Sequence, residues 1–314
     1  MSRSNPEHHS AHHSPSTHHD LYAEVTNAII AALEAGTPPW VCPWNKGHGS
    51  LIPANLTTGR PYRGVNVLLL NLRQMACGYS RNHWLTFQQA HSVGARVRKG
   101  EHGTRIVFFK LMERDDDSAP GQAANDEPTR RVIPLLRSFT VFNEAQVDDL
   151  PAGLTWPEAP ESIWSPCDEA DAVLVKSGAL FRHGGDRAFY TPSQDFIQMP
   201  PPEVFESSER YYNVALHELT HWTGHPSRCN RPLAGRQHIE AYAFEELVAE
   251  MGSAFLSSHC GLPTQLHHAS YIKSWLQALR DDKRLVFTAA SQAQKAVDFL
   301  VGEANVAQRE EVNA

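Results

Sequence analysis

Two histidines spaced four residues apart, His217 and His221, flank a glutamate, Glu218, within an otherwise mostly apolar stretch. On an α-helix, residues i and i+4 lie one turn apart on the same face, so both imidazoles can reach one ion. A buried helix does not carry two histidines and a glutamate on one side unless something satisfies them. The HExxH pattern therefore predicts a metal-binding helix over residues 206–223, with Glu218 as the general base for a water molecule.

A catalytic site of this kind takes a third protein ligand, which the next predicted helix, over residues 240–259, can supply. Glu245, Glu246 and Glu250 follow His221 by 24, 25 and 29 residues, a spacing that resembles thermolysin-type zincins. Because Glu246 and Glu250 share a helix face, we predict Glu246 as the ligand. Glu250 is the alternative ligand or the acceptor for a histidine N–H. One divalent ion is expected, zinc in the first place and manganese as the alternative, because a His₂Glu site accepts several metals.

The residues that follow the motif bear on two other ligand arrangements. A metzincin would have a histidine at position 227, where this chain has Ser227. His225 lies four residues beyond His221 and could serve as an extra ligand, but Gly224 precedes it and should end the helix.

The first half of the chain contains a strongly basic segment. Between Trp40 and Leu111 there are ten Lys or Arg residues and one acid, Glu101, although the whole chain has a net charge of −7. Aromatic residues lie among these cations, and single-stranded nucleic acid is held by cations that meet phosphates and by aromatic faces that stack on bases. A solvated basic surface over an aromatic core explains the same composition equally well. The candidate DNA contacts are Arg60, Arg63, Arg98, Lys99 and Arg105 for phosphates, and Trp40, Trp44, Tyr62 and Trp84 for bases.

Composition divides the chain into two domains. Residues 1–20 form a His-rich tail that is expected to be disordered, because it has too few apolar residues to form a core. Residues 21–150 form the first domain, with a flexible insertion at residues 114–130, and residues 151–166 are a Pro- and Trp-rich linker. Residues 167–314 form the second domain, which carries most of the negative charge. We expect residues 21–150 to fold and to bind DNA on their own.

Hydrophobic periodicity predicts an α+β fold in the first domain and a mostly helical second domain. Beyond the two metal-site helices, the expected helices cover residues 20–35, 65–76, 86–93, 271–282 and 289–301. The expected strands cover residues 104–111, 137–143, 188–190 and 196–199, and the first two should pair as a hairpin around the insertion. No run reaches the roughly 18–20 apolar residues of a membrane helix. A membrane partner is therefore not expected. The five cysteines form no CxxC pair, so a reducing compartment and a cytoplasmic location are expected.

Seven strings in the sequence resemble one known family, the ArdC-type plasmid antirestriction proteins. In the first domain they are GTPPWVCPW (36–44), GRPYRGVN (59–66), WLTFQQA (84–90), VRKGEHGT (97–104) and FTVFNEAQVDDL (139–150). In the second domain they are HELTHWTGHPSRCNR (217–231) and YAFEELVAEMGSAFL (242–256). The order of the strings is that of the family.

The resemblance implies a single-stranded-DNA-binding domain joined to a zincin-like metallopeptidase domain. It also implies that the protein shields incoming plasmid DNA from host restriction during conjugation, with a protein of the host restriction system as a candidate target. Binding to DNA is expected to be independent of base sequence, because no motif that reads base edges is present. The main alternative is a DNA-binding module whose metal is structural or occluded, without peptidase turnover. A protease delivered together with DNA is a third reading.

Overall fold

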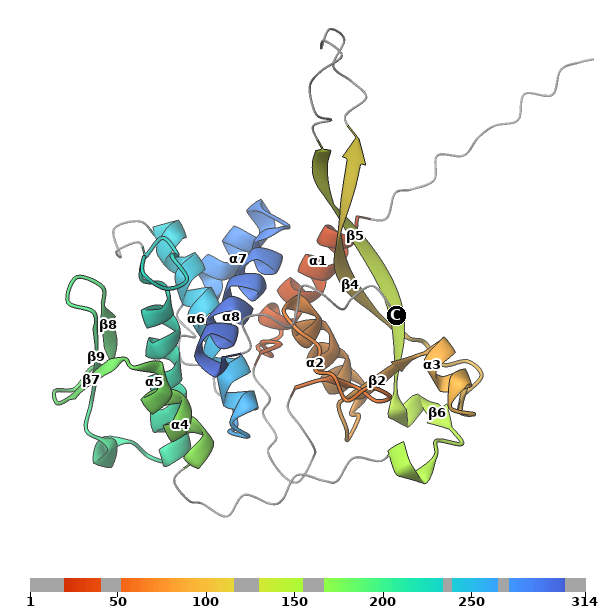
Figure 1. Cartoon of the computed structure of the whole chain (residues 1–314), viewed down its shortest axis with the longest axis horizontal. Coiled ribbons are helices and arrows are strands. Elements are labelled where there is room, and N and C mark those ends of the chain that lie inside the picture. The colour runs from red at the N-terminus through yellow and green to blue at the C-terminus, as the bar shows by residue number, and fades with distance from the viewer. Residues whose placement is uncertain are drawn as a thin grey trace, which may run out of the picture.

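The first domain is built around a four-stranded sheet in the order β1-β2-β5-β4 (Figure 1). The structure, a computed structural model, describes residues 20–40, 52–115, 130–154, 167–233, 239–264 and 271–302. Strands β4 (Thr104–Asp115) and β5 (Arg130–Asn143) pair antiparallel along their length. This hairpin confirms the expected pair of strands on either side of the insertion, most of which lies outside the described residues.

Two shorter strands extend this sheet, and a separate two-stranded sheet lies nearby. Strand β2 (His83–Thr86) runs antiparallel to β5, and β1 (Ala54–Asn55) runs parallel to β2. The second sheet consists of β3 (Arg96–Val97) and β6 (Val147–Asp148). The helices of this domain are α1 (Leu21–Glu34), α2 (Val65–Cys77) and α3 (Phe87–Ser92), followed by the 3₁₀ turns η1 (Glu144–Gln146) and η2 (Ala152–Leu154).

Local sequence explains where α1 and α3 begin and where α2 ends. The Asp20 carboxylate accepts hydrogen bonds from the N–H groups of Tyr22 and Ala23, which caps α1. Thr86 and Gln89 form a reciprocal capping box at the start of α3. Helix α2 ends at Gly78, whose φ of 65° is left-handed and favours glycine.

The second domain is mostly helical, as the sequence predicts. Its helices are α4 (Asp168–Ser177), α5 (Ser208–Thr223), α6 (Ile239–His259), α7 (Ile272–Asp281) and α8 (Leu285–Val301), and a short 3₁₀ turn, η3, covers Pro202–Val204. A small sheet has the order β7-β9-β8, formed by β7 (Leu180–His183), β9 (Phe196–Met199) and β8 (Phe189–Thr191). Among the described residues, no helix is both long enough and apolar enough to cross a membrane.

Helix α4 was missed from sequence because its hydrophobic signal is faint. It buries only Ala170 and Val173, and its first turn carries three acids. Such acids stabilise the start of a helix through its dipole, which is an electrostatic effect that hydrophobic periodicity does not register.

Helices α5 and α6 approach each other closely at Gly252. A Cβ atom added to Gly252 would lie 2.5 Å from Cγ2 of Thr220. Thr220 is fully buried and donates its hydroxyl hydrogen to the carbonyl of Leu216, 2.8 Å away, within its own helix. Glycine at position 252 is therefore what allows the two helices to pack this tightly.

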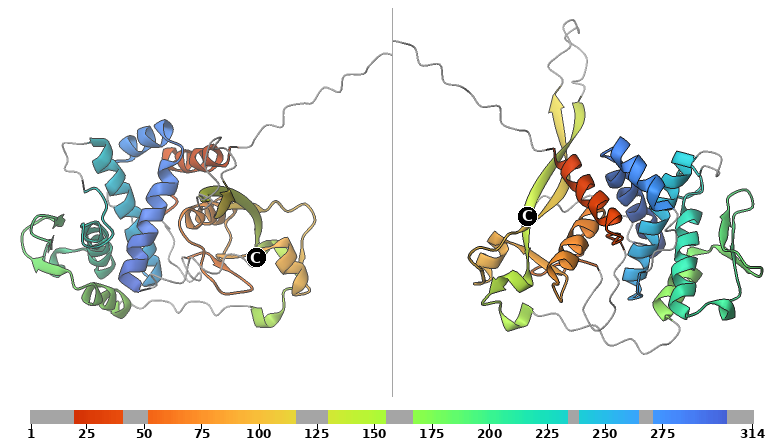
Figure 2. Two further views of the ribbon diagram at one scale, coloured as in Figure 1. Left: turned by 45° about the horizontal axis from the view of Figure 1, so that its top comes forward. Right: turned by 180° about the vertical axis from the view of Figure 1, so that it is seen from behind.

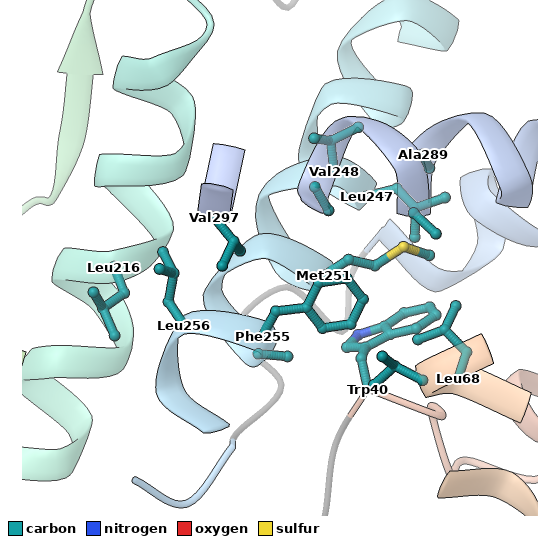
Figure 3. Close-up of a cluster of buried hydrophobic side chains, with 14 of the residues drawn as sticks. Trp40, Leu68, Leu216, Leu247, Val248, Met251, Phe255, Leu256, Ala289 and Val297 are labelled. Atoms are coloured by element: carbon teal, nitrogen blue, oxygen red, sulfur yellow. The ribbon is translucent and has the colours of Figure 1, made fainter. Parts of the chain in front are cut away.

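One hydrophobic core runs through both domains. Side chains from α1 and α2 pack with those from α6, α7 and α8 in a single buried cluster, and the two halves lie side by side in each view (Figure 2). Trp40 lies at this junction, 3 % exposed, next to Leu68 and facing Met251 and Phe255 (Figure 3). Its ring meets Trp275 edge to face at a centroid distance of 5.9 Å.

Polar contacts reinforce the junction. The Arg63 guanidinium forms an ion pair with Asp298 of α8. The N–H of Gly64 donates to Gln294 Oε1 at 3.1 Å, and the Thr26 hydroxyl donates to the Lys283 carbonyl at 2.7 Å. A fragment of residues 21–150 would expose this whole face to water, so the shared core argues against its folding as well alone as in the full chain.

Replacement of Trp40 by alanine tests the shared core. We expect the full chain to lose about 3–5 kcal/mol of unfolding free energy, because a large buried side chain is removed. Urea denaturation, monitored by circular dichroism, measures the loss. Phe87→Ala is the control, because Phe87 is 63 % exposed and its removal should change stability by less than about 0.5 kcal/mol. A Trp40→Ala protein of unchanged stability but reduced affinity for single strands would instead make Trp40 a base-stacking residue.

Candidate metal centre

Helix α5 carries the HExxH residues on the side that faces α6. The Ser207 hydroxyl caps the helix by accepting the N–H of Arg210, and Gly224 ends it. His217 and His221 lie one turn apart, and their ring centroids are separated by 4.8 Å. Their Nε2 atoms point toward the same place and lie 3.2 Å apart. The helical spacing alone is responsible for this convergence.

Glu246 of α6 completes a three-residue cluster. Its Oε2 lies 3.5 Å from His217 Nε2, and its Oε1 lies 3.7 Å from His221 Nε2. Zinc–nitrogen and zinc–oxygen bonds of about 2.0–2.2 Å in a tetrahedral arrangement separate neighbouring ligand atoms by about 3.3–3.5 Å. The observed separations match this spacing, so the donor set fits one small divalent ion. Among the described residues, this is the group of His, Cys, Asp and Glu whose ligand atoms converge in this way.

The cluster is largely shielded from water. His217 and Glu246 are 2 % and 4 % exposed, and Glu218 is 7 % exposed. Glu218 follows His217 directly on α5 and precedes His221 by three residues, so it projects from the same side of the helix. A carboxylate in this position can act on a water molecule held beside the three ligands.

A second carboxylate from α6 meets the outer side of His221. Glu245 Oε1 lies 3.2 Å from His221 Nδ1. Glu245 in turn receives two hydrogen bonds from Arg231, from Nε to Oε2 at 2.9 Å and from Nη2 to Oε1 at 2.8 Å. The acceptor facing His221 is thus Glu245. Glu250, which we expected to accept from a histidine N–H, is buried further along α6, and its role stays a prediction.

These contacts shift the pKa values of the groups in the cluster. Burial opposes a charge on His221, but the Glu245 and Glu246 carboxylates outweigh it and raise the pKa of His221 to about 10. Burial raises the pKa of Glu246, but His217 and His221 dominate and hold that pKa well below its usual range. A metal ion therefore competes with a proton for His221.

Arg231 was not predicted from sequence, and His225 takes no part in the cluster. His225 lies in the turn after α5, where its Nδ1 is 2.8 Å from the Ser227 hydroxyl. Arg231 follows in the same connection and folds back onto α5. Its role could not be found from spacing, because it depends on a reversal of the chain and not on helical periodicity.

Some of the residues expected to contact DNA are buried in the core, and others lie at the surface. Trp84 is fully buried, and its indole N–H donates to Asn82 at 2.7 Å. Trp40 is equally enclosed in the shared core, and Arg63 is paired with Asp298. The stacking role expected for Trp40 and Trp84 is therefore corrected, because packing in the core encloses both side chains. The phosphate contact expected for Arg63, whose side chain is 30 % exposed, stays a prediction. Trp44 lies outside the described residues.

The remaining candidates lie nearer the surface. Arg60 and Lys99 are exposed, and Tyr62 is partly buried, with burial raising the pKa of its hydroxyl. Arg98 forms ion pairs with Glu101 and Asp148, at 3.0 Å and 3.3 Å. Both pairs are exposed to solvent, so phosphate groups can compete for this guanidinium.

A groove of about 490 Å³ lies on the same domain, between α1, α2 and the start of β4. Leu21, Val25, Leu69 and Leu72 form part of its apolar wall, and Arg73 and Arg105 line it as well. Arg105 pairs there with Glu24 at 2.6 Å. Arg73 Nε and Thr104 Oγ1 are buried and have no hydrogen-bond partner within the described part of the chain. The sequence marks Arg73 only as one cation within a predicted helix, so its place in the groove does not follow from local pattern.

Two family models match the chain, one on each domain. Residues 19–142 match the N-terminal domain of anti-restriction factor ArdC, and residues 168–292 match a zincin-like metallopeptidase. Protein y4eC of Sinorhizobium fredii is 41 % identical over 307 residues, which cover 95 % of this chain and 97 % of that protein. DNA primase TraC of Escherichia coli is 42 % identical over 295 residues, and this chain spans only 27 % of its length.

Solved structures show the same relationship. The metal-free crystal structure of antirestriction ArdC protein from the R388 plasmid superimposes with a TM-score of 0.77 and 41 % identity, covering 91 % of this chain and 98 % of that one. The Mn(II)-bound structure of the same protein gives a TM-score of 0.74, also at 41 % identity, and covers 92 % of this chain and 100 % of that one. With agreement in sequence, domain order and fold over nearly the whole length, the chain belongs to the ArdC family of antirestriction proteins.

Proposed function

We propose that this protein binds one divalent metal ion through His217, His221 and Glu246 and single-stranded DNA through its first domain, and that it protects incoming plasmid DNA from host restriction during conjugation. The observation that carries the metal site is the convergence of three ligand atoms, within 4.8 Å of one another, from two closely packed helices. The zincin-like family model and the Mn(II)-bound relative support a divalent ion. Zinc and manganese both suit this ligand set.

The arrangement supports hydrolysis of a peptide bond. When bound, the ion would polarise a carbonyl group and lower the pKa of a neighbouring water. Glu218 takes the proton from the attacking water and returns it to the leaving amine. Glu245 fixes the orientation of the His221 ring through Nδ1. A protein of the host restriction system is the substrate that the family's role suggests.

The burial of the cluster favours a second candidate function. Its ligands are nearly enclosed, with His217 only 2 % exposed. Structural metal sites are closed, whereas catalytic sites keep one position open to water and substrate. In this alternative, the ion stabilises the fold, and protection of DNA depends on DNA binding alone.

The charge distribution of the first domain supports binding to single strands. The basic segment places Arg60 and Lys99 on the surface and Arg73 in the groove beside α1. The apolar wall of that groove can receive a base while Arg73 meets a phosphate. Such contacts are independent of base sequence, because they involve only the backbone and the faces of bases.

His221→Ala tests metal binding. We expect the variant to lose stoichiometric metal and the thermal stabilisation that added ion gives the unaltered protein, about 2.7 kcal/mol at a free ion concentration 100 times the Kd. Elemental analysis and thermal unfolding with and without chelator provide the measurements. His225→Ala is the matched control, since His225 lies just beyond the helix and outside the cluster. Full metal occupancy in the His221→Ala protein would contradict the assignment.

Glu218→Gln separates the two candidate functions. If the site is catalytic, the variant keeps metal and DNA binding but loses protection of an incoming plasmid, because the amide cannot accept the proton. Conjugation into restricting and non-restricting recipients measures protection. Undiminished protection by Glu218→Gln would show that the metal is structural.

Arg73→Ala tests the DNA surface. Each phosphate contact on a single strand contributes about −0.7 to the slope of log affinity against log salt, so the slope should flatten by about that amount. Fluorescence anisotropy with labelled oligonucleotides at several salt concentrations measures the slope. Arg182→Ala on the second domain should leave it unchanged. An unaltered slope in Arg73→Ala would place the DNA elsewhere on the first domain.

A further inference from the structure

Helix α6 presents two adjacent carboxylates to the same pair of histidines. Glu246 faces the Nε2 atoms, where the ion is placed, and Glu245 faces His221 Nδ1 from the outer side at 3.2 Å. Both residues are 4 % exposed. Two buried carboxylates this close to a divalent ion can both become its ligands. A further contact is therefore needed to hold one of them away from the ion.

Arg231 provides this separation. Its side chain is 2 % exposed, and it holds both oxygens of Glu245 through Nε and Nη2. A bidentate pair of this kind fixes the carboxylate in orientation as well as in position. A carboxylate that is held by both oxygens on the outer side of His221 cannot turn toward the ion.

The position of Arg231 is itself fixed by α5. Nη1 donates to the Thr223 hydroxyl at 2.9 Å, and Nη2 donates to the Thr220 carbonyl at 2.6 Å. Its backbone N–H donates to the Gly224 carbonyl at 2.9 Å. A Cβ atom on Gly224 would lie only 2.6 Å from Leu233 and 3.1 Å from Arg231 Nη2. The connection after α5 thus packs tightly against the end of the helix that carries the ligands.

We propose that Arg231 is a positioning residue that determines which acid binds the metal: by holding Glu245 against His221, it reserves the ion for Glu246. The charges agree with this arrangement. A divalent ion and Arg231 would supply positive charge beside the buried carboxylates of Glu218, Glu245 and Glu246. The inference rests on the proposed metal site and adds to it the cause of ligand selection.

Arg231→Met in the full chain, loaded with Co²⁺, tests the proposal. Co²⁺ reports its own coordination, because a four-coordinate ion absorbs visible light more strongly than a five- or six-coordinate ion. Once Arg231 is removed, Glu245 should join the ion, and the visible absorption should weaken while one ion remains bound. The double variant Arg231→Met/Glu245→Gln should restore the absorption of the unaltered protein. A purely structural role for Arg231 does not produce this restoration.

Controls make each outcome informative. Arg228→Met is the matched control, because Arg228 lies in the same connection but pairs with Asp195, and its spectrum should equal that of the unaltered protein. If Arg231→Met does not fold, Arg231→Lys replaces it, because a lysine cannot hold both carboxylate oxygens. An unchanged spectrum in a folded Arg231 variant, or a double variant that is not restored, would overturn the proposal. Failure of the unaltered protein to bind Co²⁺ would instead refute the metal site itself.

Discussion

The close packing of α5 against α6 is the contact on which the rest of the structure depends. Gly252 lets α6 approach Thr220, and this approach brings Glu246 to the two imidazoles of α5. The same helices supply much of the hydrophobic core, including Leu216, Leu247 and Val248. The polar cluster is therefore embedded between apolar layers, where its charges must be balanced locally because water is largely excluded. Arg231 contributes to this balance and is held in place by the same helix that provides the histidines.

Helix α6 also connects the metal cluster with the first domain. Two residues before Glu245, the carbonyl of Ala243 accepts the indole N–H of Trp275 at 2.9 Å. Trp275 contacts Trp40, which enters the shared core at the edge of the first domain. Because the largest core cluster contains residues of both halves, a change in packing at this junction alters the packing of both. The ion pair between Arg63 and Asp298 adds a directional contact to this junction.

The sequence predicted the elements better than it predicted the surface. The helices other than α4, together with the β4–β5 hairpin, follow from local periodicity and from caps such as Asp20. The DNA contacts could not be sorted in the same way, because tryptophan and arginine serve equally well in a core, an ion pair or a binding surface. Trp40 and Arg63 look like parts of a basic, aromatic surface in the sequence, yet their partners Trp275 and Asp298 lie more than 200 positions away. Only the tertiary structure brings these partners together.

For the metal cluster, the features that the local sequence determines differ clearly from those that the tertiary structure determines. The sequence by itself determined that His217 and His221 converge, because a four-residue spacing on a helix is a local geometric property. It also limited the third ligand to a few acids on the next helix. The choice among Glu245, Glu246 and Glu250 depends on how α6 is rotated about its axis against α5, and this rotation is set by the packing at Gly252. The recruitment of Glu245 by Arg231 depends on a connection that reverses direction after Gly224. Both are long-range consequences of packing, which no local pattern encodes.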